Sequence, residues 1–303
     1  MFVANKRGAS LSRTDIANGA ETHRVDTCEN PHELTVSPSE QHVMVACYSG
    51  RTLEIYDTAD LTARGAVTLG QNARVHSALW LDESRVVAGA EGRGSLYVIG
   101  LTMIDGQMPP AISQQEIGGS GPGPHLVAIN ASGDIAWGTV IPTGEVVRYD
   151  LTEGSETTRR RIGDQIEALA LSPSGSRLWV ASNSGNRAYK LDARSLEVLA
   201  EVPTGEVPIR LAVHPSGYFV VSSNYGGGDL TVIDTRTDSV VRTIPVSGSR
   251  GAAQVTLIFS EDGERLYAAE TANDTIAEID FASGEVLRRF RTGPGGDGLA
   301  VID

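Results

Sequence analysis

Histidine is the residue type whose placement in this sequence most strongly suggests chemistry. Six histidines occur in 303 residues, and three of them, His32, His76 and His125, each stand directly after the first residue of a similar segment. Neutral imidazole is the commonest metal ligand in proteins, and three imidazoles leave a coordination position open for water or a substrate. We therefore predict that these histidines hold a divalent metal ion, zinc or manganese.

Carboxylates take the same place in other segments. Counted from the segment starts, the equivalent residues are His32, His76, His125, Glu167, Ile209, Val255 and Asp297. Chance would put roughly 0.14 histidines at seven such positions. Glu167 and Asp297 are predicted to be catalytic, by completing the coordination, orienting a ligand or acting as general base. The structural alternative is that the histidines cap strand starts and bond to neighbouring backbone.

A rim of polar side chains is predicted around this position, from loops that open on the same face. Guanidinium groups bind carboxylates and phosphates through two parallel hydrogen bonds. The rim also includes Lys6, Glu91 and Asn183. The predicted substrate-binding residues are Arg51, Arg93, Arg187, Arg210, Tyr48, Asn224 and Tyr225. The alternative for any of the arginines is an ordinary solvent-facing charge.

Internal repetition indicates which elements carry these residues. The unit PHELTVSPSEQHVMVACYSGRTLEIYD begins at Pro31, and similar units begin at Val75, Pro124, Ile166, Pro208 and Gln254. An Asp lies 26 residues after the start in five units, as Asp57, Asp150, Asp192, Asp234 and Asp280. Apolar residues alternate with small or polar ones, which predicts four short antiparallel strands per unit. Four strands in a period of about 40 to 45 residues are typical of a β-propeller blade.

The seventh unit is divided between the two ends of the chain. The segment GGDGLAVID from Gly296 matches the start of a unit, and residues 1–30 match its other three strands. A C-terminal strand that pairs with N-terminal strands removes free sheet edges. We therefore predict an all-β fold, one seven-bladed β-propeller domain over residues 1–303, with four antiparallel strands per blade and the ring closed by the C-terminal strand.

The sequence also resembles a known family. The strand pattern NYGGGDLTVIDTRTDSVVRTIPV at 224–246 and the Pro-His pairs at 31–32 and 124–125 are similar to those of YVTN-repeat and lactonase-like seven-bladed propellers. The resemblance implies the propeller fold over nearly the whole chain. It implies no single activity, because the group includes lactone hydrolases, a lactonising isomerase and proteins with no assigned reaction.

Composition excludes several kinds of partner. Lys and Arg number 25 and Asp and Glu number 38, so the net charge is −13. A chain of this charge is repelled by nucleic acid and by anionic membranes. No apolar run is long enough to span a membrane. We expect a soluble monomer that acts on a small molecule, periplasmic if a leader was removed and otherwise cytoplasmic.

Two cysteines, Cys28 and Cys47, flank the first histidine of the series. Three roles are open for these cysteines: they form a disulfide, they bind a soft metal ion, or one of them acts as a nucleophile. The favoured interpretation is that both are small buried apolar residues.

These features lead to one functional hypothesis and one alternative. The hypothesis is a metal-dependent enzyme that hydrolyses a small, anionic ester or lactone, or cleaves a related compound by β-elimination, at the mouth of the central channel. The alternative is a propeller without catalytic activity that serves as a scaffold for binding a protein or ligand.

Overall fold

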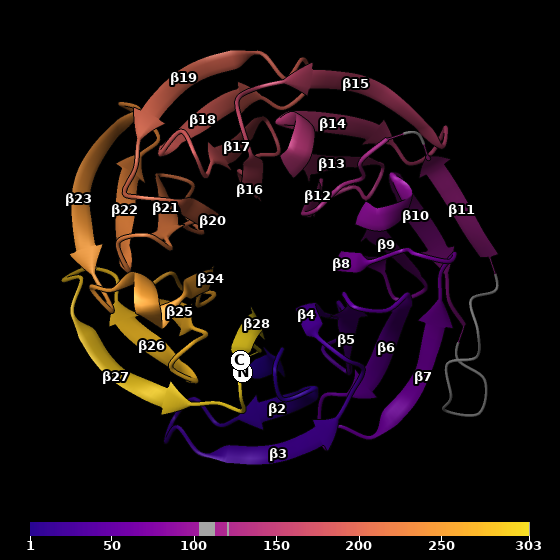
Figure 1. Cartoon of the computed structure of the whole chain (residues 1–303), viewed down its shortest axis with the longest axis horizontal. Helices are drawn as coiled ribbons and strands as arrows, with labels where there is room; N and C mark the ends of the chain where they lie inside the picture. The colour runs from indigo at the N-terminus through magenta and orange to yellow at the C-terminus, as the bar shows by residue number, and fades with distance from the viewer. Residues whose placement is uncertain (103–112, 120, 303) are drawn as a thin grey trace. The chain divides into compact units, whose positions relative to one another are not determined.

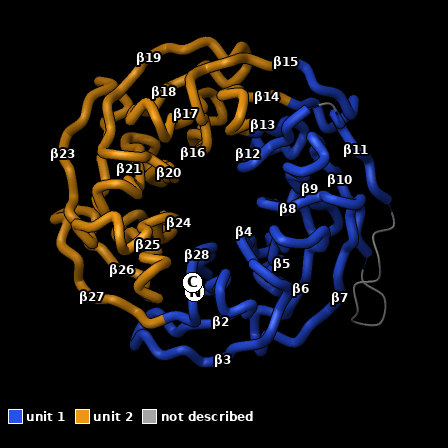
Figure 2. Tube along the Cα trace, in the orientation of Figure 1, with its two compact units in different colours: residues 1–138, 149–157, 292–302 blue, residues 139–148, 158–291, 303 orange. Residues whose placement is uncertain are grey.

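The structure is a computed structural model that describes residues 1–102, 113–119 and 121–302 (Figure 1). The described chain divides into two compact units (Figure 2). Unit 1 comprises Met1–Gly138, Tyr149–Thr157 and Thr292–Ile302, and unit 2 comprises Thr139–Arg148 and Thr158–Arg291. None of the helices among these residues is long and apolar enough to cross a membrane.

Seven four-stranded sheets account for the strands of the described residues. Three lie in unit 1, with strands β28 (Gly296–Ala300), β1 (Phe2–Asn5), β2 (Ser10–Thr14) and β3 (Glu21–Asp26); β4 (Pro31–Val36), β5 (His42–Cys47), β6 (Thr52–Asp57) and β7 (Ala63–Thr68); and β8 (Val75–Asp82), β9 (Arg85–Ala90), β10 (Ser95–Gly100) and β11 (Ser113–Gly118).

Three further sheets lie in unit 2. Their strands are β16 (Ile166–Leu171), β17 (Arg177–Ser182), β18 (Arg187–Asp192) and β19 (Val198–Pro203); β20 (Pro208–Val213), β21 (Phe219–Asn224), β22 (Asp229–Asp234) and β23 (Ser239–Pro245); and β24 (Gln254–Phe259), β25 (Arg265–Glu270), β26 (Thr275–Asp280) and β27 (Val286–Arg291).

The residues of the seventh sheet are divided between the units. Its strands are β12 (Val127–Ile129), β13 (Ile135–Val140), β14 (Glu145–Asp150) and β15 (Ser155–Arg161). Three short 3-10 helices complete the described elements, η1 (Glu91–Arg93), η2 (Ile141–Thr143) and η3 (Arg250–Ala252).

The fold class is the predicted one, a seven-bladed β-propeller with four antiparallel strands per blade. The division of one blade between the chain ends is also confirmed. C-terminal strand β28 pairs antiparallel with N-terminal strand β1, with Phe2 opposite Ala300 and Val3 opposite Leu299. The single-domain boundary at 1–303 stays a prediction.

Apolar side chains of neighbouring sheets form the core of each unit. In unit 1, Leu53 and Ile55 of one sheet pack with Trp80 and Ile99 of the next. Every one of these side chains is buried. Since burial of apolar surface is the main favourable term in folding, these two blades of unit 1 depend on each other for stability.

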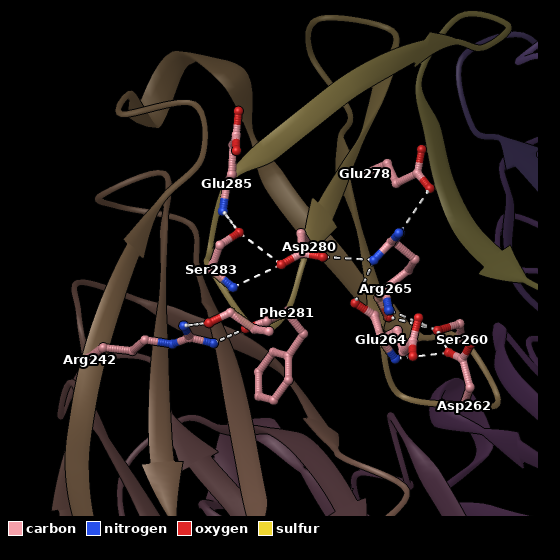
Figure 3. A network of polar contacts seen from close by, with 11 residues as sticks. Arg242, Ser260, Asp262, Glu264, Arg265, Glu278, Asp280, Phe281, Ser283 and Glu285 are labelled. Atoms are coloured by element: carbon pink, nitrogen blue, oxygen red, sulfur yellow. Dashed lines mark hydrogen bonds and ion pairs between the residues drawn. The ribbon is translucent and has the colours of Figure 1, made fainter.

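The recurring Asp at the end of the third strand closes a turn. Asp280 accepts hydrogen bonds from the backbone N–H and the hydroxyl of Ser283, each at 2.8 Å, and from Arg265 Nη1 at 2.8 Å. These contacts are drawn in Figure 3. Asp192 accepts in the same way from the Ser195 N–H at 2.9 Å. Asp is favoured at such turns because its side chain is short, so the carboxylate accepts hydrogen bonds from backbone N–H groups two or three residues later.

Candidate functional site

The first strand of most blades carries a β-bulge at the position that the sequence singled out. In β8 the ladder moves from Val75 to Ser77, so that His76 is the extra residue. In β4 His32 and Glu33 together oppose one residue of β5. The bulged residues in the other strands are Glu167, Ile209, the pair Val255 and Thr256, and Asp297. A bulge re-aims a side chain away from the pleat, which presents these residues at the strand start.

A left-handed residue precedes the bulged strand in most blades. The residues with positive φ are Asn30 (53°), Arg74 (46°), Gln165 (50°), Val207 (56°), Ala253 (49°) and Gly295 (74°). Except for Arg74, each of these residues accepts a hydrogen bond at its carbonyl from the residue that follows the second strand. Lys6 N–H donates to Gly295 at 2.8 Å and Tyr48 N–H donates to Asn30 at 3.2 Å. This hydrogen bond holds a rim residue beside the bulge.

Val207 is the most strained residue of this series, because a β-branched side chain strongly disfavours positive φ. Its backbone is held by Asn186 Oδ1 and by the Tyr225 N–H, both at 2.9 Å. Asparagine tolerates this conformation and occupies the equivalent position as Asn30. We expect Val207→Asn to raise the free energy of unfolding by about 0.5 to 1 kcal/mol in urea denaturation. Val198→Asn, at an exposed strand position, should give no gain.

Three histidines stack in unit 1. The ring centroids of His32 and His76 lie 3.9 Å apart, and those of His76 and His125 lie 3.5 Å apart. His32 and His76 are on β4 and β8, as predicted, but His125 lies before β12, which starts only at Val127. The proline before His125 is not the reason, because Pro31 and Pro208 occupy the equivalent position and begin β4 and β20.

A lysine and a buried carboxylate sit at the His32 end of the stack. Lys6 Nζ lies 2.8 Å from His32 Nε2 and 3.1 Å from Asp297 Oδ2. Burial lowers the pKa of His32, so its ring is neutral at pH 7 and Nε2 accepts from the Lys6 ammonium. His32 Nδ1 then faces Glu33 Oε1 at 3.6 Å and Asp297 Oδ2 at 3.5 Å.

An acidic and a basic residue sit at the other end. His125 Nδ1 lies 3.1 Å from Glu91 Oε2. Burial raises the pKa of Glu91, but His125, Arg74 and Tyr48 outweigh it and lower the pKa overall. The Arg74 guanidinium lies 4.7 Å above the Tyr48 ring and hydrogen-bonds its hydroxyl. Burial and then the Glu91 carboxylate raise the pKa of Tyr48, so the phenol stays protonated.

Two of the three predicted metal ligands lie close to a carboxylate that was not predicted, and the role of His125 as a ligand stays a prediction. Ligand atoms of His32, Glu33 and His76 all lie within 4.8 Å of one another. Among the described residues, His125 does not join a group of this kind with His32 and His76. The bulge in β4 is the cause, because it sets Glu33 next to His32 opposite a single residue of β5.

Of the predicted substrate-binding residues in unit 1, Tyr48 reaches the histidines. Its ring lies 5.3 Å from that of His32 and 5.2 Å from that of His76, edge-on in both cases. Arg93 instead holds Glu116 through two hydrogen bonds of 3.0 Å, and Arg51 is exposed. Of these three predicted residues, Tyr48 is therefore the one that the structure places beside the histidines.

The remaining predicted residues belong to unit 2 and are described within it. Buried Arg210 pairs with Glu167 Oε1 at 3.2 Å, and Asn183 Nδ2 donates to Glu167 Oε2 at 2.5 Å. Arg187 pairs with Glu201 at 2.9 Å, and Tyr225 lies 5.7 Å from the Arg250 guanidinium.

Asn224 lies inside its blade rather than on the predicted rim. It is fully buried, and its Nδ2 donates to Asp229 Oδ1 at 2.6 Å and Thr231 Oγ1 at 2.9 Å. Its Oδ1 accepts from Ser222 Oγ at 2.7 Å. With its amide engaged inside the blade, Asn224 does not present itself to a substrate.

The favoured interpretation of the cysteines as two separate apolar residues is wrong, because Cys28 and Cys47 form a disulfide. The ladder explains the pairing, since Pro31, just after Cys28, lies opposite Cys47. The bond also removes both sulfurs as thiolate ligands or nucleophiles.

Sequence reasoning missed two residues of this site, Glu33 and Arg74. Glu33 directly follows His32, and a carboxylate beside a candidate histidine ligand was the available signal. Arg74 occupies the position before a bulged strand, where its positive φ turns the side chain onto Tyr48.

Comparison with known proteins agrees with this fold. Residues 149–246 match the family model described as lactonase, 7-bladed beta-propeller. A solved structure of hydrazine synthase from Kuenenia stuttgartiensis superposes with a TM-score of 0.79 at 17% identity, covering 93% of this chain and 92% of that chain. At this identity the likeness concerns the fold alone. The predicted resemblance to lactonase-like seven-bladed β-propellers is confirmed.

Two curated proteins match a shorter part of the chain. A dihydro-heme d1 dehydrogenase from Pseudomonas aeruginosa is 29% identical over 134 residues, which are 44% of this chain and 26% of that protein. Antigen Lp49 from Leptospira interrogans is 30% identical over 132 residues, which are 43% of this chain and 27% of that protein. The chain thus spans about a quarter of the length of these relatives.

Proposed function

We propose that unit 1 binds a divalent metal ion through His32, Glu33 and His76 and uses it on a small anionic ester or lactone, by hydrolysis or by β-elimination. The observation that carries the proposal is the convergence of these three side chains within 4.8 Å. Two ligand atoms on one tetrahedral zinc ion lie about 3.4 Å apart. His32 Nδ1 and Glu33 Oε1, at 3.6 Å, are close to that separation.

Burial supports an ion rather than a large ligand at this place. His32 is 6% exposed and His76 1% exposed. A donor set of two imidazoles and a carboxylate suits zinc and leaves a coordination position open. Manganese remains the second candidate, because it accepts the carboxylate oxygen readily.

The neighbouring residues have roles that follow from their contacts. When bound, the metal supplies a Lewis acid for a carbonyl oxygen and a water of lowered pKa. Coordination through His32 Nδ1 needs the ring hydrogen on Nε2, so Lys6 must leave Nε2 and remain with Asp297, which is 3.1 Å away. Lys6 and Arg74 then offer positive charge to an anionic substrate. Asp297 is the nearby residue proposed to move the proton, and the catalytic role of Glu167 stays a prediction from the sequence.

Metal analysis tests the proposal. We expect protein purified without a metal-affinity tag to carry about one ion per chain. The double variant His32→Ala, His76→Ala should lose that ion, because a lone carboxylate does not retain it. Elemental analysis measures both, with circular dichroism as a check of folding.

His42→Ala, His214→Ala is the matched control, because it removes two histidines outside the stack and should keep its metal. Equal metal content in all three proteins would end the metal proposal. Turnover of a lactone or ester that survives in the double variant would end the catalytic one.

The alternative proposal is a binding propeller without activity. One curated relative bears the name dihydro-heme d1 dehydrogenase, which refers to a haem. Imidazole is a common ligand of haem iron. Haemin is therefore the probe for this alternative. A Soret shift that requires His32 and His76, in protein that carries no zinc or manganese, would favour the alternative.

A further inference from the structure

A cavity of about 440 Å³ lies in unit 2, between the sheets β16–β19 and β20–β23. It is separate from the histidine stack, and its walls come from the turn after β16, the turn after β20 and the end of β22. The cavity is within the volume range of small-molecule sites. Three cations line it, Arg177, Lys190 and Arg236, and none of the described lining residues is a carboxylate.

The three cations keep unused hydrogen-bond donors. Lys190 Nζ donates to Thr235 O and Asp238 Oδ1, both at 2.8 Å, which leaves one of its three N–H groups. Arg236 uses Nε and Nη2 on Asp234, which leaves Nη1. Arg177 bonds Ser176 O and Asp192 through Nη1 alone, which leaves Nε and Nη2.

The cavity also has an apolar wall. Tyr218 is 53% exposed, and the Arg236 guanidinium lies 5.0 Å from its ring. Pro173 and Val213 line the cavity beside it, and the Lys190 ammonium lies 5.8 Å from the buried Trp179 ring. A ligand with a flat apolar part finds contact area here, while its charged end meets the cations.

The equivalent cavity one blade further on has the opposite character. It measures about 420 Å³ and is lined by Asp262, Glu264 and Asp280 with Arg265. Figure 3 labels these four residues. Arg265 is the first residue of β25, as Arg177 is the first residue of β17 two blades earlier. Because the backbone turns are the same, the cationic lining of the first cavity is a property of its side chains and not of the fold.

We infer that the cavity lined by Arg177, Lys190 and Arg236 binds a small organic oxyanion, a phosphate ester or a carboxylate on a flat apolar group. Guanidinium groups recognise both anions through paired hydrogen bonds. The remaining donors on three cations supply such bonds without breaking the existing ion pairs. Phosphate and carboxylate ligands share this chemistry, so the experiment compares them.

Titration calorimetry with phenyl phosphate and benzoate tests the site, with inorganic phosphate and benzyl alcohol as the two half-ligands. We expect saturable binding of at least one aromatic anion, about tenfold tighter than either half-ligand. Removing one charged donor should weaken it at least tenfold, since such a hydrogen bond contributes about 1.5 to 3 kcal/mol. Arg177→Gln and Arg236→Gln are the variants.

Arg265→Gln is the matched control and should bind as the parent does. The parent protein gives an independent readout, because the Trp179 indole N–H resonance should shift on titration and that of Trp137 should not. Binding should persist in the His32→Ala, His76→Ala variant, so failure of the metal site leaves this inference standing. No saturation at millimolar ligand, or equal weakening by Arg265→Gln, would overturn it.

Discussion

Replacing Gly298 by alanine is expected to lower the free energy of unfolding by about 3 kcal/mol, the upper end of the usual cost of overpacking. A Cβ atom at Gly298 would lie 1.9 Å from the His32 carbonyl oxygen and 3.0 Å from its carbonyl carbon. Both are backbone atoms of the bulged part of β4, so no side-chain rotation relieves the clash. Urea denaturation, followed by circular dichroism, measures the loss.

The same substitution should weaken metal binding at least tenfold, because the displaced carbonyl belongs to a proposed ligand residue. Gly50→Ala is the matched control in the same unit. Its Cβ would meet nothing closer than the Cys47 carbonyl oxygen at 3.6 Å, which is ordinary contact. We expect a change within about 0.5 kcal/mol for this variant. A Gly298→Ala protein as stable as Gly50→Ala would show that β28 and β4 are less closely packed than described.

The fold was predictable because its signals are local and repeated. Alternating apolar residues, a turn every few residues and an Asp at the end of the third strand in five units recur through the chain, and every copy strengthens the others. Even the blade shared by the two chain ends follows from the repeat, because GGDGLAVID needs three further strands that residues 1–30 supply.

For the site, the sequence predicts which residues occupy equivalent positions in the blades, but not which side chains contact one another. Counting from the repeat start identifies the bulged residue in every first strand that has a bulge, and His32, His76 and Asp297 are such residues. The count does not reveal how each bulge is built. In β8 the ladder skips His76 alone, whereas in β4 His32 and Glu33 share one partner, and this difference makes Glu33 a candidate ligand.

Arg74 was not predicted, and the disulfide was not the favoured interpretation of the cysteines, for a related reason. The positive φ of Arg74 depends on the turn into β8, and the disulfide depends on the register between β4 and β5. Both are set by hydrogen bonds between segments, and neither leaves a mark in the spacing of apolar residues. Repeat analysis therefore locates the rim residues but does not identify their partners.

Replacing both cysteines by serine is expected to lower the free energy of unfolding by about 3 kcal/mol. The bond joins residues 19 apart, and loop closure in the unfolded chain predicts a loss of this size for a loop near that length. In the folded protein the bond ties the segment before β4 to the end of β5, where Cys28 N–H also donates to Glu54 Oε2 at 3.2 Å. Urea denaturation of the Cys28→Ser, Cys47→Ser variant measures the loss.

Reduction of the parent protein supplies the control for this variant. Parent protein in excess dithiothreitol should unfold at the same urea concentration as the double serine variant, because both lack the bond and keep the other contacts. The variant itself should not respond to dithiothreitol. Cys47 directly precedes Tyr48, whose ring contacts those of the proposed ligands His32 and His76. The reduced protein should therefore also bind metal more weakly than the oxidised one. Unchanged denaturation of the parent on complete reduction, verified by thiol titration, would show that the ladder between β4 and β5 holds this segment without the bond.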